Sequence, residues 1–207
     1  MTTRGIVVAA LAATLLASPA VWAGPPTDQL RSYTEAVIRV LEDPALKVDG
    51  RRGERRAAVR RLAADVFDVN ETARRALGLH WQARTAAERK EFVSLFAELL
   101  ERTFINRIDY FGGERLRFVS ESIDGDAAVV RARVVTRGGT EVPVDARLVR
   151  RGERWLVYDI AVENISLIAN YRAQFDKIIR TSSYEDLVRR LRTKQTEFLD
   201  EASRKGA

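Results

Sequence analysis

Residues 155–175, WLVYDIAVENISLIANYRAQF, decide the fold of this chain. The first part alternates large apolar residues with polar or smaller ones, which is typical of a half-buried strand. Its apolar positions are Leu156, Tyr158, Ile160 and Val162. After Glu163-Asn164 the apolar spacing becomes helical, at Leu167, Ile168, Tyr171, Phe175 and Ile178. The chain therefore leaves a sheet and enters a helix here, and both elements can direct large side chains towards one cavity.

Upstream of this junction the sequence predicts an antiparallel meander. Strand-like runs at 115–123, 127–137, 140–150 and 153–162 are separated by short Gly-containing turns. One face of the middle runs is apolar and the other carries alternating charges, so one face is expected to be buried. The apolar face consists of Ala128, Val130, Ala132, Val134, Val142, Val144, Ala146 and Leu148. Pro143 interrupts a run and indicates an edge strand or a bulge.

Helical patterns flank these strands. They predict helices at about 28–43, 54–67, 68–77 and 86–110, with two more after residue 166. Thr85 and Glu88 form a capping box at the start of the longest helix. That helix is apolar over much of its girth, so it should be packed on two sides. The fold class is α+β, a small antiparallel sheet of about four strands wrapped by several helices.

The first residues have the pattern of a secretory signal peptide. Arg4 precedes an apolar run over 6–17 that is short for a bilayer span. Val21 and Ala23 then place small residues at the −3 and −1 positions of a cleavage site. We expect residues 1–23 to be a signal peptide cleaved after Ala23, and residues 24–207 to be one domain. An uncleaved anchor is the alternative interpretation. The chain has no cysteine, so the exported domain is expected to fold without disulfides.

Motifs for catalysis or metal binding are missing from the sequence. His80 is the sole histidine, and Ser166 does not lie in a nucleophile elbow. The formal charge of +6 comes mainly from arginine; in an exported protein such a surface suits lipid phosphates or an acidic partner better than nucleic acid. We expect no enzyme activity, no cofactor and no metal, and a monomer that binds no nucleic acid.

Several motifs resemble those of the MlaC, or toluene-tolerance, family of periplasmic phospholipid carriers. Residues 158–175 are similar to the family pattern Tyr-Asp-x-x-x-Glu-Gly-x-Ser-x-x-x-x-Tyr-Arg-x-Gln-Phe, with Asn164 in place of the Gly. Asn tolerates positive φ, so the turn can be kept. The segments 75–89, 126–133, 140–148 and 180–187 resemble other parts of the family in the same order, and the likeness spans roughly residues 28–195.

This resemblance implies a sheet of NTF2-like or cystatin-like type and an apolar cavity for lipid tails between sheet and helices. It places Arg172 near the cavity mouth. The lipid-contacting residues expected from the pattern and the resemblance together are Phe96, Leu100, Phe104, Val130, Val134, Val144, Leu148, Tyr158, Ile160, Ile168, Tyr171 and Phe175.

By resemblance the protein would shuttle phospholipids between the inner and outer membranes as the soluble component of an Mla-type ABC lipid-transport system. Its partners would be an inner-membrane complex of an MCE protein with an ABC transporter and an outer-membrane lipoprotein complex.

Three alternatives stay open from the sequence. The ligand could be a hopanoid or another polycyclic lipid. An NTF2-like cavity could instead host an isomerase or hydratase with Asp145 or Asp159 as a buried base, although both carboxylates are expected on the face away from Val144. Finally, the protein could be an interaction adaptor without a cavity.

Overall fold

The computed structural model describes residues 24–48, 50–105 and 110–205, with side chains up to residue 194. The predicted signal peptide lies outside them. The helices are α1 (Pro25–Glu42), α2 (Pro44–Lys47), α3 (Arg52–Val66), α4 (Val69–Leu77), η1 (Gly78–Trp81), α5 (Ala86–Ile105), α6 (Leu167–Thr181) and α7 (Tyr184–Lys205). The strands are β1 (Arg115–Asp124), β2 (Ala127–Val135), β3 (Glu141–Arg151), β4 (Arg154–Val162) and β5 (Ile165–Ser166). Of the residues predicted to extend α5, 106–109 lie outside the described ranges.

The sheet is the predicted antiparallel meander, with strand order β1-β2-β3-β4-β5 and one short strand more than predicted. Its apolar face has the predicted composition, because Val130 pairs with Ala146 and Ala132 with Val144. The turn from β4 into β5 places Glu163 and Asn164 at φ of 50° and 66°. A two-residue hairpin turn of this kind requires positive φ at both central positions, which confirms the interpretation of Asn164.

A bulge in β4 corrects the predicted alternation of that strand. Leu148 pairs with Val157 and Arg147 with Asp159, so the intervening Tyr158 has no partner on β3. The extra residue shifts the side-chain phase by one. As a result Val157 and Ile160 share the apolar face, whereas Tyr158 lies under the guanidinium of Arg75, 3.9 Å from the ring centroid.

Pro143 lies in the central strand β3, which corrects the predicted edge position. It pairs with Arg133 of β2, and its carbonyl accepts a hydrogen bond from Glu163 N at 3.0 Å. In an antiparallel ladder the N–H and C=O groups of one residue point towards the same neighbouring strand. The N–H group that proline lacks would therefore have pointed towards the end of β4. Since Val144–Val162 is the last β3–β4 pair, the proline removes no bond from the ladder interior.

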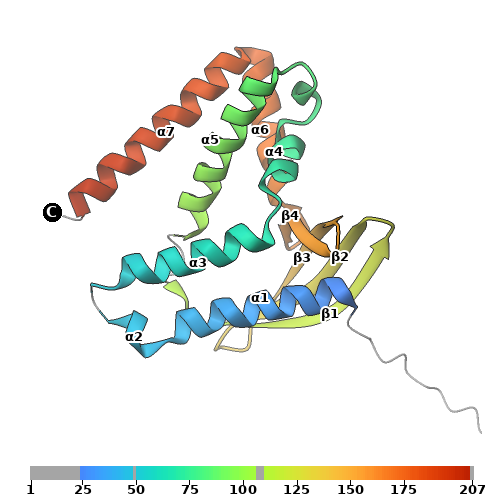
Figure 1. The fold of residues 1–207 in the computed structure, drawn as a ribbon, viewed down its shortest axis with the longest axis vertical. Coiled ribbons are helices and arrows are strands. Elements are labelled where there is room, and N and C mark those ends of the chain that lie inside the picture. Colours follow the sequence, from blue (N-terminus) through green and yellow to red (C-terminus); the bar gives the residue numbers. More distant parts are fainter. Residues whose placement is uncertain (1–23, 49, 106–109, 206–207) are drawn as a thin grey trace, which may run out of the picture.

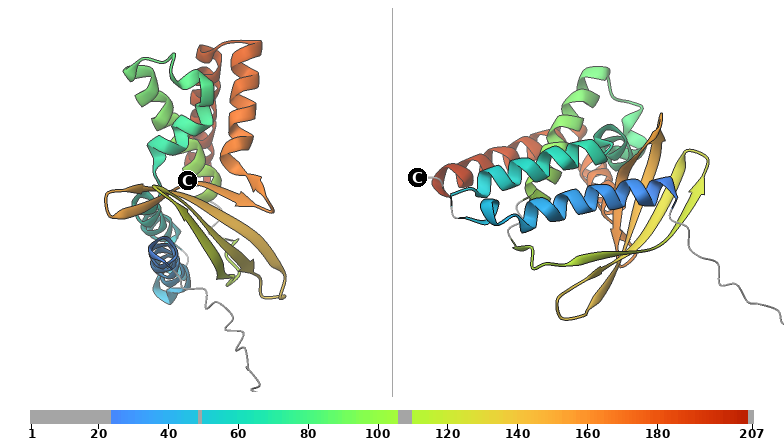
Figure 2. Two further views of the ribbon diagram at one scale, coloured as in Figure 1. Left: turned by 90° about the vertical axis from the view of Figure 1, so that its right-hand side faces the viewer. Right: turned by 60° about the horizontal axis from the view of Figure 1, so that its bottom comes forward.

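The helices divide into two groups around the sheet (Figure 1). Helices α4, α5, α6 and α7 pack together as an upright bundle, whereas α1 crosses one face of the sheet with α3 beside it, as both views of Figure 2 show. Side-chain caps fix the starts of three of these helices. Thr85 and Glu88 exchange backbone–side-chain hydrogen bonds, as the predicted capping box requires. The side chains of Asp68 and Ser166 cap α4 and α6. Within the described residues, no helix combines the length and the hydropathy needed to cross a bilayer.

Candidate functional site

An apolar cavity of about 330 Å³ lies between α1 and the sheet. Strand residues form its floor, and α1, the end of α3 and the start of β1 form its walls and roof. The lining residues are Leu30, Tyr33, Thr34, Val37, Ile38, Leu41, Val66, Phe67, Phe111, Glu114, Arg115, Leu116, Phe118, Val130, Ala132, Val134, Val144, Ala146, Val157 and Ile160. Nearly all of them are hydrophobic, so the cavity suits hydrocarbon.

Small side chains on the sheet explain why this space is hollow. The floor is made largely of alanine and valine, including Ala132, Val144 and Ala146. These side chains rise little above the pleated surface, and the apolar stripe of α1, with Leu30 and Val37, faces them from the other side. An interior is filled only where side chains reach across it. Here the two surfaces leave a gap.

Polar contacts fasten α1 over the cavity. At its N-terminal end, Thr27 donates to Glu121 Oε2 from both its amide (3.0 Å) and its hydroxyl (2.5 Å). Two residues further on, Gln29 Oε1 accepts a hydrogen bond from the Trp155 amide at 2.7 Å. At its C-terminal end, Glu42 pairs with Arg115 at the start of β1. The Glu121 carboxylate also stands at the positive end of the α1 dipole, which is a favourable place for it.

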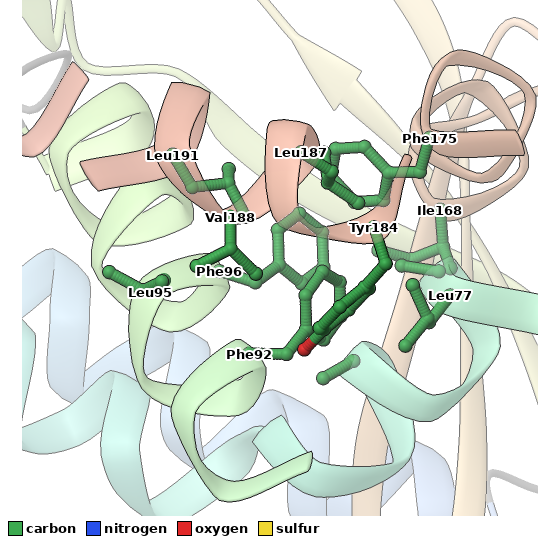
Figure 3. Close-up of a cluster of buried hydrophobic side chains, with 12 residues drawn as sticks. Leu77, Phe92, Leu95, Phe96, Ile168, Phe175, Tyr184, Leu187, Val188 and Leu191 are labelled. Carbon is green, nitrogen blue, oxygen red and sulfur yellow. The ribbon is translucent and has the colours of Figure 1, made fainter. Parts of the chain in front are cut away.

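The helical bundle, in contrast, is filled by aromatic rings (Figure 3). Phe96 lies at the centre, with ring centroids 5.8 Å from Phe92, 5.1 Å from Tyr171 and 5.3 Å from Phe175. Phe92 and Phe96 are 0% exposed. Leu187, Val188 and Leu191 of α7 close the cluster from the other side. These edge-to-face and stacked contacts belong to a packed core.

The family model described as MlaC protein matches residues 31–193. The chain belongs to the MlaC family. Its fold is similar to that of the phospholipid-binding protein from Ralstonia solanacearum, solved in complex with a phospholipid. The two are 23% identical, the match covers 83% of this chain and 97% of that one, and the TM-score is 0.70. At this identity the likeness concerns the fold.

A second solved structure, described as an NTF2-like transpeptidase from Campylobacter jejuni, is 16% identical over 64% of this chain and 95% of that one. Its TM-score of 0.36 is too low to carry an argument. No curated protein matches the chain.

In this MlaC-family chain, the residues predicted to contact lipid do not gather in one place. Val130, Val134, Val144 and Ile160 line the cavity, and Leu148 is buried beside it in the same cluster. The aromatic bundle contains or adjoins Phe96, Leu100, Ile168, Tyr171 and Phe175. Phe104 is 42% exposed on α5, and Tyr158 lies under Arg75. Lipid contact therefore stays a prediction for all of them. The sheet residues face a cavity, whereas the bundle residues pack against one another.

Arg172, predicted at the mouth, lies elsewhere on this MlaC-family chain. It lines a separate depression between η1 and α6, together with Leu79, His80 and Asp176. Among the lining residues that the structure describes, the charged ones are Glu114 and Arg115. Sequence reasoning missed these two and the residues of α1. The apolar stripe of the first helix was visible in the sequence, but no local signal shows which face of the sheet a helix about 90 residues upstream will cover.

The buried ionisable groups serve structure in this fold. Asp159 accepts hydrogen bonds from Arg147 Nη1 (2.8 Å), Ser166 Oγ (2.6 Å) and the Ile168 amide (3.1 Å). His80 Nε2 lies 2.9 Å from Asp176 Oδ1. Ser166 and His80 are thus each engaged with a different carboxylate. Within the described ranges, no group of three or more His, Cys, Asp or Glu side chains is arranged to hold a metal.

A second buried carboxylate joins the two halves of the molecule. Glu71 of α4 contacts Arg74 and Arg75 at 2.6 and 2.7 Å and Arg151 of β3 at 3.4 Å, and Arg151 also pairs with Asp68 at 2.8 Å. The hydrogen bond from Arg74, helped by Arg75 and opposed by burial, lowers the pKa of Glu71 to about 2. The junction between bundle and sheet is therefore ionic over a wide pH range.

Proposed function

We propose that this protein is a soluble phospholipid carrier that holds the acyl chains of one lipid in the cavity between α1 and the sheet. The observation that carries the proposal is a hollow apolar space, bounded by α1 and a sheet face of small residues, in a chain of the MlaC family. The fold likeness to a protein solved with a phospholipid bound supports it.

Energetics give the reason for such a carrier. A diacyl lipid carries about 30 methylene groups, each worth about 0.8 kcal/mol on leaving water, so bare transit through water costs roughly 20 kcal/mol or more. An apolar cavity replaces the contacts that the tails lose on leaving a membrane. Transfer between membrane and carrier then comes close to balance.

The size of the cavity implies movement on loading. Pockets for drug-sized ligands measure about 300–1,000 Å³, so the present volume of about 330 Å³ is at the lower end of that range. Two acyl chains are larger than such a ligand. Loading therefore requires α1 and the sheet to separate, and the hydrogen bonds of Thr27 and Gln29 are among the contacts that resist this.

We further infer that the protein works in the periplasm after removal of residues 1–23, carrying lipid between an inner-membrane complex of an MCE protein with an ABC transporter and an outer-membrane lipoprotein complex. Family membership supports this setting. An isomerase or hydratase would need a carboxylate base inside the cavity. Asp145 and Asp159 are instead cross-strand partners of Arg131 and Arg147, on the sheet face away from the cavity, which disfavours such an enzyme. We propose a binding protein without catalytic turnover.

Native mass spectrometry of protein purified from its own periplasm tests the proposal. We expect phospholipid to co-purify with the protein, and we expect the intact mass of the protein to place its N-terminus at Gly24. A polycyclic species in the cavity would replace the phospholipid assignment with the hopanoid one. Ligand-free protein that takes up no lipid from vesicles would contradict the carrier function. Release of fatty acid from bound phospholipid would contradict the absence of catalysis.

A further inference from the structure

The cavity has one charged end. Among its described lining residues, Glu114 and Arg115 carry charges, and they adjoin each other at the start of β1. The Arg115 side chain is 61% exposed although the residue lines the cavity. The apolar lining therefore meets solvent at a guanidinium.

The two charged residues differ in how they are held. Glu114 Oε2 accepts a hydrogen bond from the Gly112 amide at 2.8 Å, which ties it to the turn before β1. Arg115 Nη1 lies 2.9 Å from Oε1 of Glu42, and the Glu42 side chain is 41% exposed. The Arg115–Glu42 ion pair thus connects the last residue of α1 to the first residue of β1. It joins α1 to the start of β1 at the charged end of the cavity.

We propose that Arg115 binds the phosphate of the phospholipid, and that Glu42 occupies Arg115 in the empty protein. This inference rests on the proposed function and names the residue that recognises the ligand's charged group. With the acyl chains in the apolar part, the phosphate has to stay at the charged, solvent-facing end. A guanidinium binds phosphate and carboxylate with the same two-pronged geometry, so one can replace the other.

The solvent exposure of Arg115 and Glu42 keeps the free-energy cost of this exchange small. An ion pair between two solvent-exposed side chains contributes little to stability, so Arg115 can leave Glu42 at small cost. The incoming phosphate restores a charge-assisted hydrogen bond. The Glu42 carboxylate would repel a phosphate if it stayed beside Arg115. Binding of the lipid is therefore coupled to the departure of Glu42 from Arg115. The carrier then distinguishes lipids that have a phosphate from those that lack one, whatever alcohol the phosphate carries.

Arg117 provides a matched control. It lies two residues further along β1, its side chain is 57% exposed, and it pairs with Glu141 at 2.5 Å. It is an exposed, carboxylate-paired arginine of the same strand, but it is not part of the cavity lining. Arg115→Gln and Arg117→Gln therefore remove the same charge from the protein.

The test offers the purified wild-type protein and the Arg115→Gln, Arg117→Gln and Glu42→Gln variants equal amounts of dioleoyl phosphatidylglycerol and dioleoylglycerol in detergent micelles. Mass spectrometry measures the ratio of the two bound lipids. Wild type and Arg117→Gln should share one ratio, Arg115→Gln should lower it about five-fold, and Glu42→Gln should raise it. An unchanged ratio in an Arg115→Gln variant that still binds lipid would overturn the inference and leave the carrier function standing. A wild type that binds neither lipid would contradict the carrier function itself, and this inference with it.

Discussion

The sheet with α1 and the helical bundle are both apolar, yet one is hollow and the other is filled. In the bundle, Phe92, Phe96 and Phe175 meet across the interior with ring centroids 5.3–5.8 Å apart. Under α1, alanines and valines of the sheet face a helix across a cavity of about 330 Å³. Side-chain size, rather than hydrophobicity, distinguishes the two regions. The bundle interior is therefore a packed core, whereas the space between α1 and the sheet is where the proposed function places the ligand.

Replacing Val144 by Asp in the cavity floor should have the largest effect, the loss of nearly all bound lipid. A carboxylate in contact with hydrocarbon is costly to bury, and Val144 lines the cavity next to Ala132. Circular dichroism should still report a folded protein, and lipid extraction measures retention. Val119→Asp, at an exposed bulge position of β1, is the control and should keep its lipid. Full occupancy in folded Val144→Asp protein would refute the assignment of the cavity.

Replacing Phe96 by Ala should have the opposite outcome, a large loss of stability without loss of lipid from the molecules that remain folded. Phe96 is fully buried among three rings, and a Phe→Ala change in a core typically costs about 3–5 kcal/mol. Urea unfolding can follow Trp81 in the bundle and Trp155 in the sheet separately, in single-tryptophan variants. A Phe96→Ala protein of normal stability that has lost its lipid would move the binding site into the bundle.

Acid should weaken the junction between the two regions. The folded pKa of Glu71, about 2, lies below its ordinary value of 4.5. The stabilisation is therefore complete above about pH 4.5 and is lost as pH falls towards 2. Because the arginine partners are half-exposed, we expect a loss of about 1–2 kcal/mol. Unfolding free energies of wild type and Glu71→Gln should converge as pH falls through this window. Parallel curves would show that Glu71 does not link folding to pH.

Filling the cavity should give the smallest change in stability and still remove function. Ala132→Leu places extra carbon atoms where the space is empty, and cavity filling commonly adds about 0.5–2 kcal/mol. Lipid content should fall while the unfolding free energy of the lipid-free protein rises. Ala87→Leu, at an exposed position of α5, controls for the added apolar surface. A less stable Ala132→Leu protein that keeps its lipid would indicate that this part of the floor is already filled.

The sequence predicted most of the elements because their signals are local. The Gly-containing turns predicted the meander, and Thr85 with Glu88 predicted the start of α5. Asn164 indicated that the tight turn after β4 could form. The bulge at Tyr158 had no such signal, since an inserted residue looks like ordinary alternation until its partner strand is known.

The site was predicted only in part for a related reason. Periodicity shows which face of an element is buried, so it identified Val130, Val134, Val144 and Ile160 correctly as inward-facing. It does not show whether the opposing side chains fill the space, so Phe96, Tyr171 and Phe175 were assigned to a cavity although they are packed against one another. Arg115 was missed because its place at the cavity and its ion pair with Glu42 bring together residues far apart in the chain.

Photo-crosslinking tests the central claim most directly, namely that lipid tails occupy the space under α1 and not the bundle. The protein is loaded with a phospholipid that carries a diazirine on one acyl chain, irradiated, and mapped by peptide mass spectrometry. Adducts should fall on α1 and on the floor strands, for example at Val37, Ala132 and Val144. Adducts concentrated at Phe96, Tyr171 and Phe175 would contradict the account.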